Sequence, residues 1–117
     1  MGLDLFAGMP VSDYATATAW YERFLGSAPS LLPNDIEAVW EVGEHQYVYI
    51  LVRPADAGHG LLTLFVDDLD DLDDRMSAIA SRGLEPTQRE TYDNGVRKVT
   101  FHDPDGNEIG FGGRPAS

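Results

Sequence analysis

Apolar and polar residues alternate over the first eleven positions of the chain, as in a strand with one buried face. The spacing then changes to that of an amphipathic helix, which Ser12 or Asp13 can cap and Gly26 can end. A strand followed by a helix is therefore predicted. The apolar strand positions are Leu3, Leu5, Ala7, Met9 and Val11, and the apolar helix face holds Ala17, Trp20, Tyr21, Phe24 and Leu25.

Two further strands are predicted after a loop through Pro29 and Pro33. They span residues 36–42 and 46–53, and a tight turn at residues 43–45 joins them. Residues 54–60 are the only stretch with the composition of a linker.

The same order then repeats in the second half of the chain. A strand at 61–66 precedes a helix that Asp68 caps and Gly83 ends, and strands at 85–91, 96–101 and 108–111 follow. The helix face is made of Leu69, Leu72, Met76, Ile79 and Ala80.

Superposing residues 11–13 on 66–68, an offset of 66 − 11 = 55 residues, matches strand to strand and helix to helix. The predicted fold class is therefore α+β. Two βαβββ modules, residues 1–56 and 57–117, form concave mixed sheets with the helices on the outside. Together they make one domain that spans 1–117.

A strongly specified turn separates the last two strands, with the sequence Asp103-Pro104-Asp105-Gly106-Asn107. Pro fixes φ, Gly accepts a positive φ, and the Asp and Asn side chains bond back to the backbone. This is the chemistry of a hairpin turn, and by itself it indicates no function.

The amino-acid composition excludes some classes of binding partner. Eight Lys and Arg against 20 Asp and Glu give the 117-residue chain a formal net charge of −12, which repels nucleic acid and attracts cationic ligands. No run approaches the roughly 18 apolar residues of a membrane helix, and Met1-Gly2-Leu3-Asp4 lacks the features of a secretory signal. We therefore expect a cytoplasmic protein without nucleic acid or membrane partners. The chain has no Cys, which excludes disulfides and thiolate metal sites.

Four segments in this order resemble the vicinal oxygen chelate superfamily of glyoxalases, bleomycin resistance proteins and extradiol dioxygenases. They are residues 9–13, residues 20–26 with the sequence Trp-Tyr-Glu-Arg-Phe-Leu-Gly, residues 65–69 and the turn at 103–107. The resemblance covers nearly the whole chain. It implies the duplicated fold and, in the metalloenzymes, one divalent ion held by four side chains of the concave sheets.

Carried over by position, that ligand set is missing. The two first-strand positions, usually His or Gln, fall at Phe6 and Leu61, and the two last-strand positions, usually Glu, fall at Tyr49 and Gly110. None of these offers the carboxylate, imidazole or amide donors that a divalent ion needs in the ordinary way. We therefore predict no metal of the family type and no cofactor.

A displaced site is the alternative. Asp4 and His59 each precede a vacant first-strand position by two residues, and Glu108 lies close to Gly110, although we expect it to point to the other face. His45 and His102 lie in or beside turns, and none of the three histidines has a short metal-binding spacing. These histidines are therefore interpreted as surface or hairpin residues.

Two functions remain open at this point. The first is a metal-free protein that binds a small aromatic or cationic ligand, forms a homodimer and resembles the bleomycin resistance branch. The second is an enzyme of the glyoxalase or dioxygenase kind, a lyase or oxidoreductase, with an atypical metal or acid–base site at Asp4, His59 or Glu108. For the metal-free binding protein, the predicted ligand-binding residues form an apolar wall within one chain or across a dimer. The alternative is that they only fill the core or a dimer interface. They are Phe6, Trp40, Tyr47, Tyr49, Leu61, Thr63 and Gly110.

Overall fold

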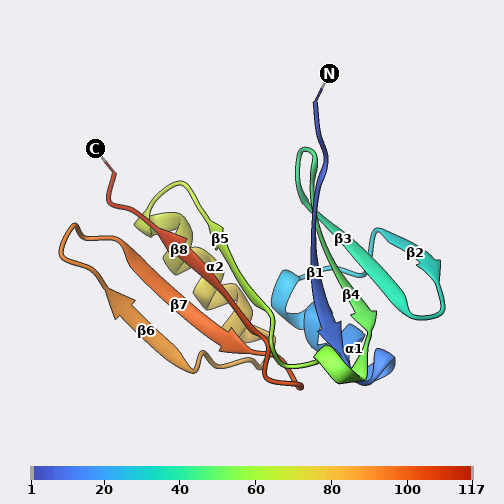
Figure 1. The fold of residues 1–117 in the computed structure, drawn as a ribbon. Helices are drawn as coiled ribbons and strands as arrows, with labels where there is room; N and C mark the ends of the chain where they lie inside the picture. The colour runs from blue at the N-terminus through green and yellow to red at the C-terminus, as the bar shows by residue number, and fades with distance from the viewer. Residues whose placement is uncertain (1, 117) are drawn as a thin grey trace.

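The computed structural model describes residues 2–116, and within them the chain forms two four-stranded sheets and two α-helices (Figure 1). The first module contains β1 (Leu5–Val11), α1 (Tyr14–Leu25), β2 (Leu31–Asn34), β3 (Glu37–Gly43) and β4 (Gln46–Val52). A short 3-10 helix, η1 (Pro54–Asp56), leads to the second module. It contains β5 (Leu61–Phe65), α2 (Leu69–Ser81), β6 (Gln88–Thr91), β7 (Arg97–His102) and β8 (Glu108–Gly113).

The two sheets have the same topology. Their strand orders are β1-β4-β3-β2 and β5-β8-β7-β6, with the first and last strand of each module parallel and the other pairs antiparallel. The registers also correspond, because Phe6 pairs with Tyr47 and Leu61 pairs with Glu108. The prediction of two βαβββ modules with mixed sheets is confirmed.

The position of strand β2 was not predicted: the βαβββ repeat implies a further strand in the first module, but these residues were assigned to a loop. The strand contains Pro33, lies at the edge of its sheet and pairs with β3 at Leu31 and Asn34, with an irregularity between them. Proline is tolerated in edge strands because their outer N–H groups have no partner. The sequence signal of this strand is weak for that reason.

Both helices begin at the predicted caps. The Asp13 side chain accepts a hydrogen bond from the Thr16 N–H, and the Asp68 side chain accepts one from the Asp71 N–H. The first helix ends at Gly26, which adopts the left-handed conformation with φ 85°. No helix of residues 2–116 is long and apolar enough to cross a membrane.

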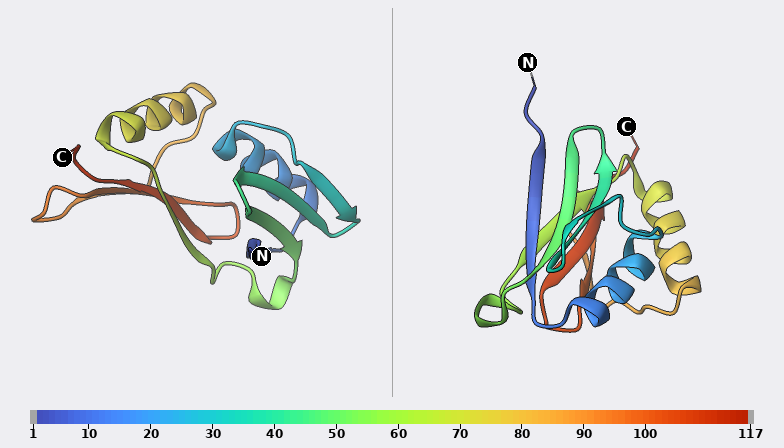
Figure 2. Two further views of the ribbon diagram at one scale, coloured as in Figure 1. Left: turned by 90° about the horizontal axis from the view of Figure 1, so that it is seen from above. Right: turned by 90° about the vertical axis from the view of Figure 1, so that its right-hand side faces the viewer.

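The two modules share one buried core. In the left view of Figure 2 both helices lie on the same side of the two sheets. Phe24 of α1 packs against Phe101 and Phe111 of the other module, with ring centroids 5.2 Å apart in each pair. Arg82, at the end of α2, donates hydrogen bonds to the carbonyls of Arg23 and Phe24 at the end of α1. The face of each sheet that lacks a helix is the open face.

The turn between β7 and β8 also joins the modules. Asp103 is 5% exposed, and its carboxylate accepts hydrogen bonds from the Tyr21 hydroxyl of α1 and from the Asn107 side-chain amide, each at 2.8 Å. The same Asn107 amide donates to the Pro10 carbonyl of β1, and its oxygen accepts from the Gly60 N–H. Burial, together with the Asp103 carboxylate, raises the pKa of Tyr21 well above its ordinary value, so the hydroxyl remains a donor.

Candidate functional site

Three aromatic side chains gather on the open face of the first sheet. The Phe6 ring centroid lies 4.5 Å from that of Tyr47 and 6.2 Å from that of Tyr49, and both pairs meet edge to face. A Cβ added at Gly8 would lie 2.7 Å from the Tyr49 ring, so this ring rests on the glycine backbone. Phe6 remains 49% exposed. These residues, which we call the aromatic cluster, form an apolar surface that a ligand can reach.

The open face of the second sheet has a small hollow of about 140 Å³. Leu61, Thr63 and Gly110 from the predicted ligand set line it. A Cβ added at Gly110 would lie 2.3 Å from the Val99 carbonyl oxygen, which is closer than two non-bonded atoms can approach. The local backbone therefore has no room for any side chain at this position unless it shifts.

The four positions of the family's metal ligands do not fit a divalent ion. Phe6 pairs with Tyr47, two residues before Tyr49, and Leu61 pairs with Glu108, two residues before Gly110. The four positions therefore correspond between the two modules, as the resemblance implies. Two of the four residues are hydrocarbon side chains, one is a phenol and one is a glycine without room for a side chain. Within residues 2–116 no three His, Asp or Glu side chains are grouped closely enough to share a metal ion.

The residues considered for a displaced site have other partners. Asp4 contacts His45, with Oδ1 2.7 Å from Nδ1, and Glu108 lies 3.5 Å from His102. The expectation that Glu108 points away from Gly110 is wrong, because residues two apart in a strand share a face. Both line the hollow in the second sheet. The structure thus brings Glu108 and His102 together, but not Asp4 and His59 with them.

Trp40 was assigned to the wrong face. It pairs with Val48 in the register of β3 and β4, one position out of phase with the aromatic cluster. The indole is 1% exposed, packs near Tyr21 of α1 and donates a hydrogen bond to the Ser27 carbonyl. It belongs to the core, and a ligand on the open face cannot reach it.

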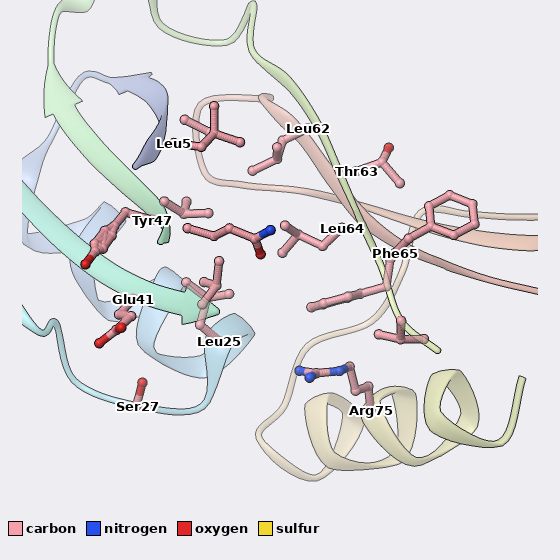
Figure 3. Close-up of a pocket in the computed structure, with 16 residues that line it drawn as sticks. Leu5, Leu25, Ser27, Glu41, Tyr47, Leu62, Thr63, Leu64, Phe65 and Arg75 are labelled. Carbon is pink, nitrogen blue, oxygen red and sulfur yellow. The ribbon is translucent and has the colours of Figure 1, made fainter. Parts of the chain in front are cut away.

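A further cavity lies between the modules, with a volume of about 470 Å³ (Figure 3). Tyr47 and Thr63 of the predicted set line it, together with residues that were not predicted to bind a ligand: Leu5, Leu25, Glu41, Leu62, Leu64, Arg75 and Phe111. Sequence periodicity carries no signal for this cleft because its walls meet only when the two modules pack together.

The comparisons agree with this architecture. The family model described as the Glyoxalase/Bleomycin resistance protein/Dioxygenase superfamily matches residues 2–111. The chain belongs to this superfamily. A glyoxalase/bleomycin resistance protein from Catenulispora acidiphila is 49% identical, with a TM-score of 0.90 over 97% of this chain and 100% of that chain.

Two solved structures of lower identity share the fold. A lactoylglutathione lyase from Agrobacterium tumefaciens is 17% identical, with a TM-score of 0.79 over 97% of this chain and 94% of that one. A bleomycin-binding protein in complex with bleomycin is 19% identical, with a TM-score of 0.73 over 97% and 98%. No curated protein matches the sequence.

Proposed function

We propose that this member of the glyoxalase superfamily is a metal-independent protein that binds a small aromatic or cationic molecule. The observation that carries the proposal is the replacement of the metal-ligand positions by Phe6, Tyr49, Leu61 and Gly110, the last without space for a side chain. A surface of aromatic and aliphatic groups stands where the metalloenzymes hold their ion. Binding by stacking and burial uses such groups directly, whereas Lewis-acid chemistry does not.

Charge supports the cationic class of ligand. The net charge of −12 attracts cations from a distance, and cations also bind favourably over aromatic faces. Partial burial raises the pKa of Tyr47, and the carboxylates of Glu41 and Asp4 raise it further. Glu41 is the register partner of Tyr47 on the neighbouring strand, so a carboxylate lies beside the aromatic cluster. Ethidium, a flat aromatic cation, is a suitable first probe, and bleomycin is a second one because a relative of this fold binds it.

One observation favours an enzyme as the second candidate. Glu108 and His102 lie 3.5 Å apart beside the hollow on the second sheet, and such a pair can move a proton to or from a ligand bound there. The enzyme is identified if the wild type converts a bound molecule and the Glu108→Gln variant still binds that molecule but no longer converts it.

Metal analysis tests the first proposal. Protein purified without chelators is expected to contain far less than one equivalent of zinc, nickel, iron or manganese, and EDTA is expected to leave its melting temperature unchanged. The reason is the absence of donors at the four positions, since a bound metal stabilises the fold in proportion to its affinity. Stoichiometric metal, or a large loss of stability with EDTA, would contradict the metal-independent function.

We also propose that the protein is a homodimer. Leu61 is 75% exposed and Phe65 52% exposed on the open face of the second sheet, and Phe6 is about half exposed on the first. Burying these side chains against a second copy removes apolar area from water. Light scattering at tens of micromolar is expected to give twice the mass of one chain, and a strictly monomeric mass would reject the dimer.

A further inference from the structure

The cleft between the modules shares Tyr47 and Thr63 with the open faces, but most of its lining lies outside them. Residues of β1 and β5 line it from its two sides, together with Leu25 at the end of α1 and Arg75 in the middle of α2. Figure 3 shows Leu5, Leu25, Leu62 and Leu64 around the gap between the two modules, and Phe111 also lines it. Its volume of about 470 Å³ falls in the range of small-molecule pockets, and its lining combines aliphatic side chains from both modules with polar and charged ones. The aliphatic part of the cleft suits the hydrocarbon part of a ligand.

Arg75 supplies the cationic group of this cleft. It extends from α2 toward the gap, with its guanidinium carbon 5.2 Å from the centroid of the Phe111 ring (Figure 3). Asp71, four residues earlier on the helix, is the neighbour with which an arginine commonly pairs. Arg75 forms no ion pair with a carboxylate of residues 2–116, although Asp71 and Asp74 lie beside it in a shallow depression. Its donors are thus left for a group that enters the cleft.

We propose that this cleft is a second binding site, which takes an amphipathic carboxylate. The carboxylate accepts hydrogen bonds from the Arg75 guanidinium, and the hydrocarbon chain lies between the leucines of the two modules. Arginine recognises carboxylates by two parallel, charge-assisted hydrogen bonds, which are stronger than neutral ones. Glu41 stands on the wall formed by the first module, so the anionic end of the ligand is directed to Arg75 and away from Glu41.

The acidic surface opposes this binding at long range. Asp67, Asp71 and Asp74 border the depression next to Arg75, and the chain carries a net charge of −12. Salt screens exposed charges beyond about 8 Å at physiological ionic strength, whereas a direct contact with the guanidinium is screened much less. The affinity for the carboxylate is therefore expected to stay the same or to rise between low and physiological salt. A site that attracts its ligand through the net charge of the protein would instead lose affinity as salt is added.

Calorimetric titration with decanoate tests the site. The wild type is expected to bind one decanoate per chain, and decanol, which has the same chain length with a neutral head, is expected to bind at least about 10-fold more weakly. Arg75→Gln keeps the length of the side chain but removes the charge, and it is expected to weaken decanoate at least about 10-fold. Arg75→Lys keeps the charge and is expected to recover part of the loss. Arg75 is exposed, so both variants should fold, and a melting curve checks this.

Arg89→Gln is the matched control, because it removes the charge of an exposed arginine of β6 that does not line the cleft. It is expected to leave decanoate affinity unchanged. The proposal is overturned if the wild type binds no decanoate, if Arg75→Gln binds it as the wild type does, if decanol binds equally well, or if Arg89→Gln weakens decanoate as much as Arg75→Gln. None of these results depends on metal content, so the metal-independent function and the second site can fail separately.

Discussion

Replacing Asp103 with Ala is expected to lower the free energy of unfolding by about 3–5 kcal/mol. The buried carboxylate accepts four hydrogen bonds: from the Tyr21 hydroxyl, the Asn107 side-chain amide and the backbone N–H groups of Asp105 and Asn107. Alanine would leave these donors without their acceptor in a site that is 5% exposed. Denaturant unfolding monitored by circular dichroism gives the difference.

Asp105→Ala is the matched control in the same turn. Asp105 accepts hydrogen bonds from the backbone N–H and the hydroxyl of Ser12, but these contacts are exposed to water. Water can replace them, so the expected loss is about 1 kcal/mol. If the two variants lose the same stability, the buried carboxylate does not hold the modules together, and the turn only reverses the chain.

Most of the fold could be predicted because local chemistry and the global repeat agree. The caps at Asp13 and Asp68, the left-handed Gly26 and the turn at residues 103–107 each mark a boundary that the structure retains. What the turn does beyond reversing the chain could not be predicted, since its buried contacts reach Tyr21 and Pro10 in the other module. Such contacts follow from the packing of the modules and leave no local pattern.

The candidate site was only partly predictable for a similar reason. Strand parity places Phe6, Tyr47 and Tyr49 on one face, because side chains two apart in a strand point the same way. Trp40 was assigned to the wrong face because an aromatic side chain can occupy either face of its sheet. Its pairing with Val48 of β4 places it on the helix-covered face. Arg75 has no pattern of its own in an acidic helix. Its place in the cleft depends on the contact between α2 and β8.

Alanine substitutions are expected to distinguish residues that bind the ligand from residues that pack the core. Phe111→Ala is expected to cost about 3–5 kcal/mol of stability, because the ring is 3% exposed and stacks on Phe24 with centroids 5.2 Å apart. Phe6→Ala is expected to cost clearly less, since about half of that side chain already contacts water. If Phe6 and Tyr49 bind the ligand, their replacement by Ala is expected to weaken ethidium binding by about 1–3 kcal/mol.

The two measurements rank the same variants in opposite order, and this makes the comparison decisive. Core residues are expected to give large losses of stability, with any loss of affinity following from partial unfolding. The aromatic cluster is expected to give losses of affinity in protein that melts nearly as the wild type does. Ile109→Ala provides a second core variant, because Ile109 is fully buried on the helix-covered face of β8. If Phe6→Ala and Tyr49→Ala destabilise the protein as much as Phe111→Ala, their rings serve packing, and the open face of the first sheet is not the ligand site.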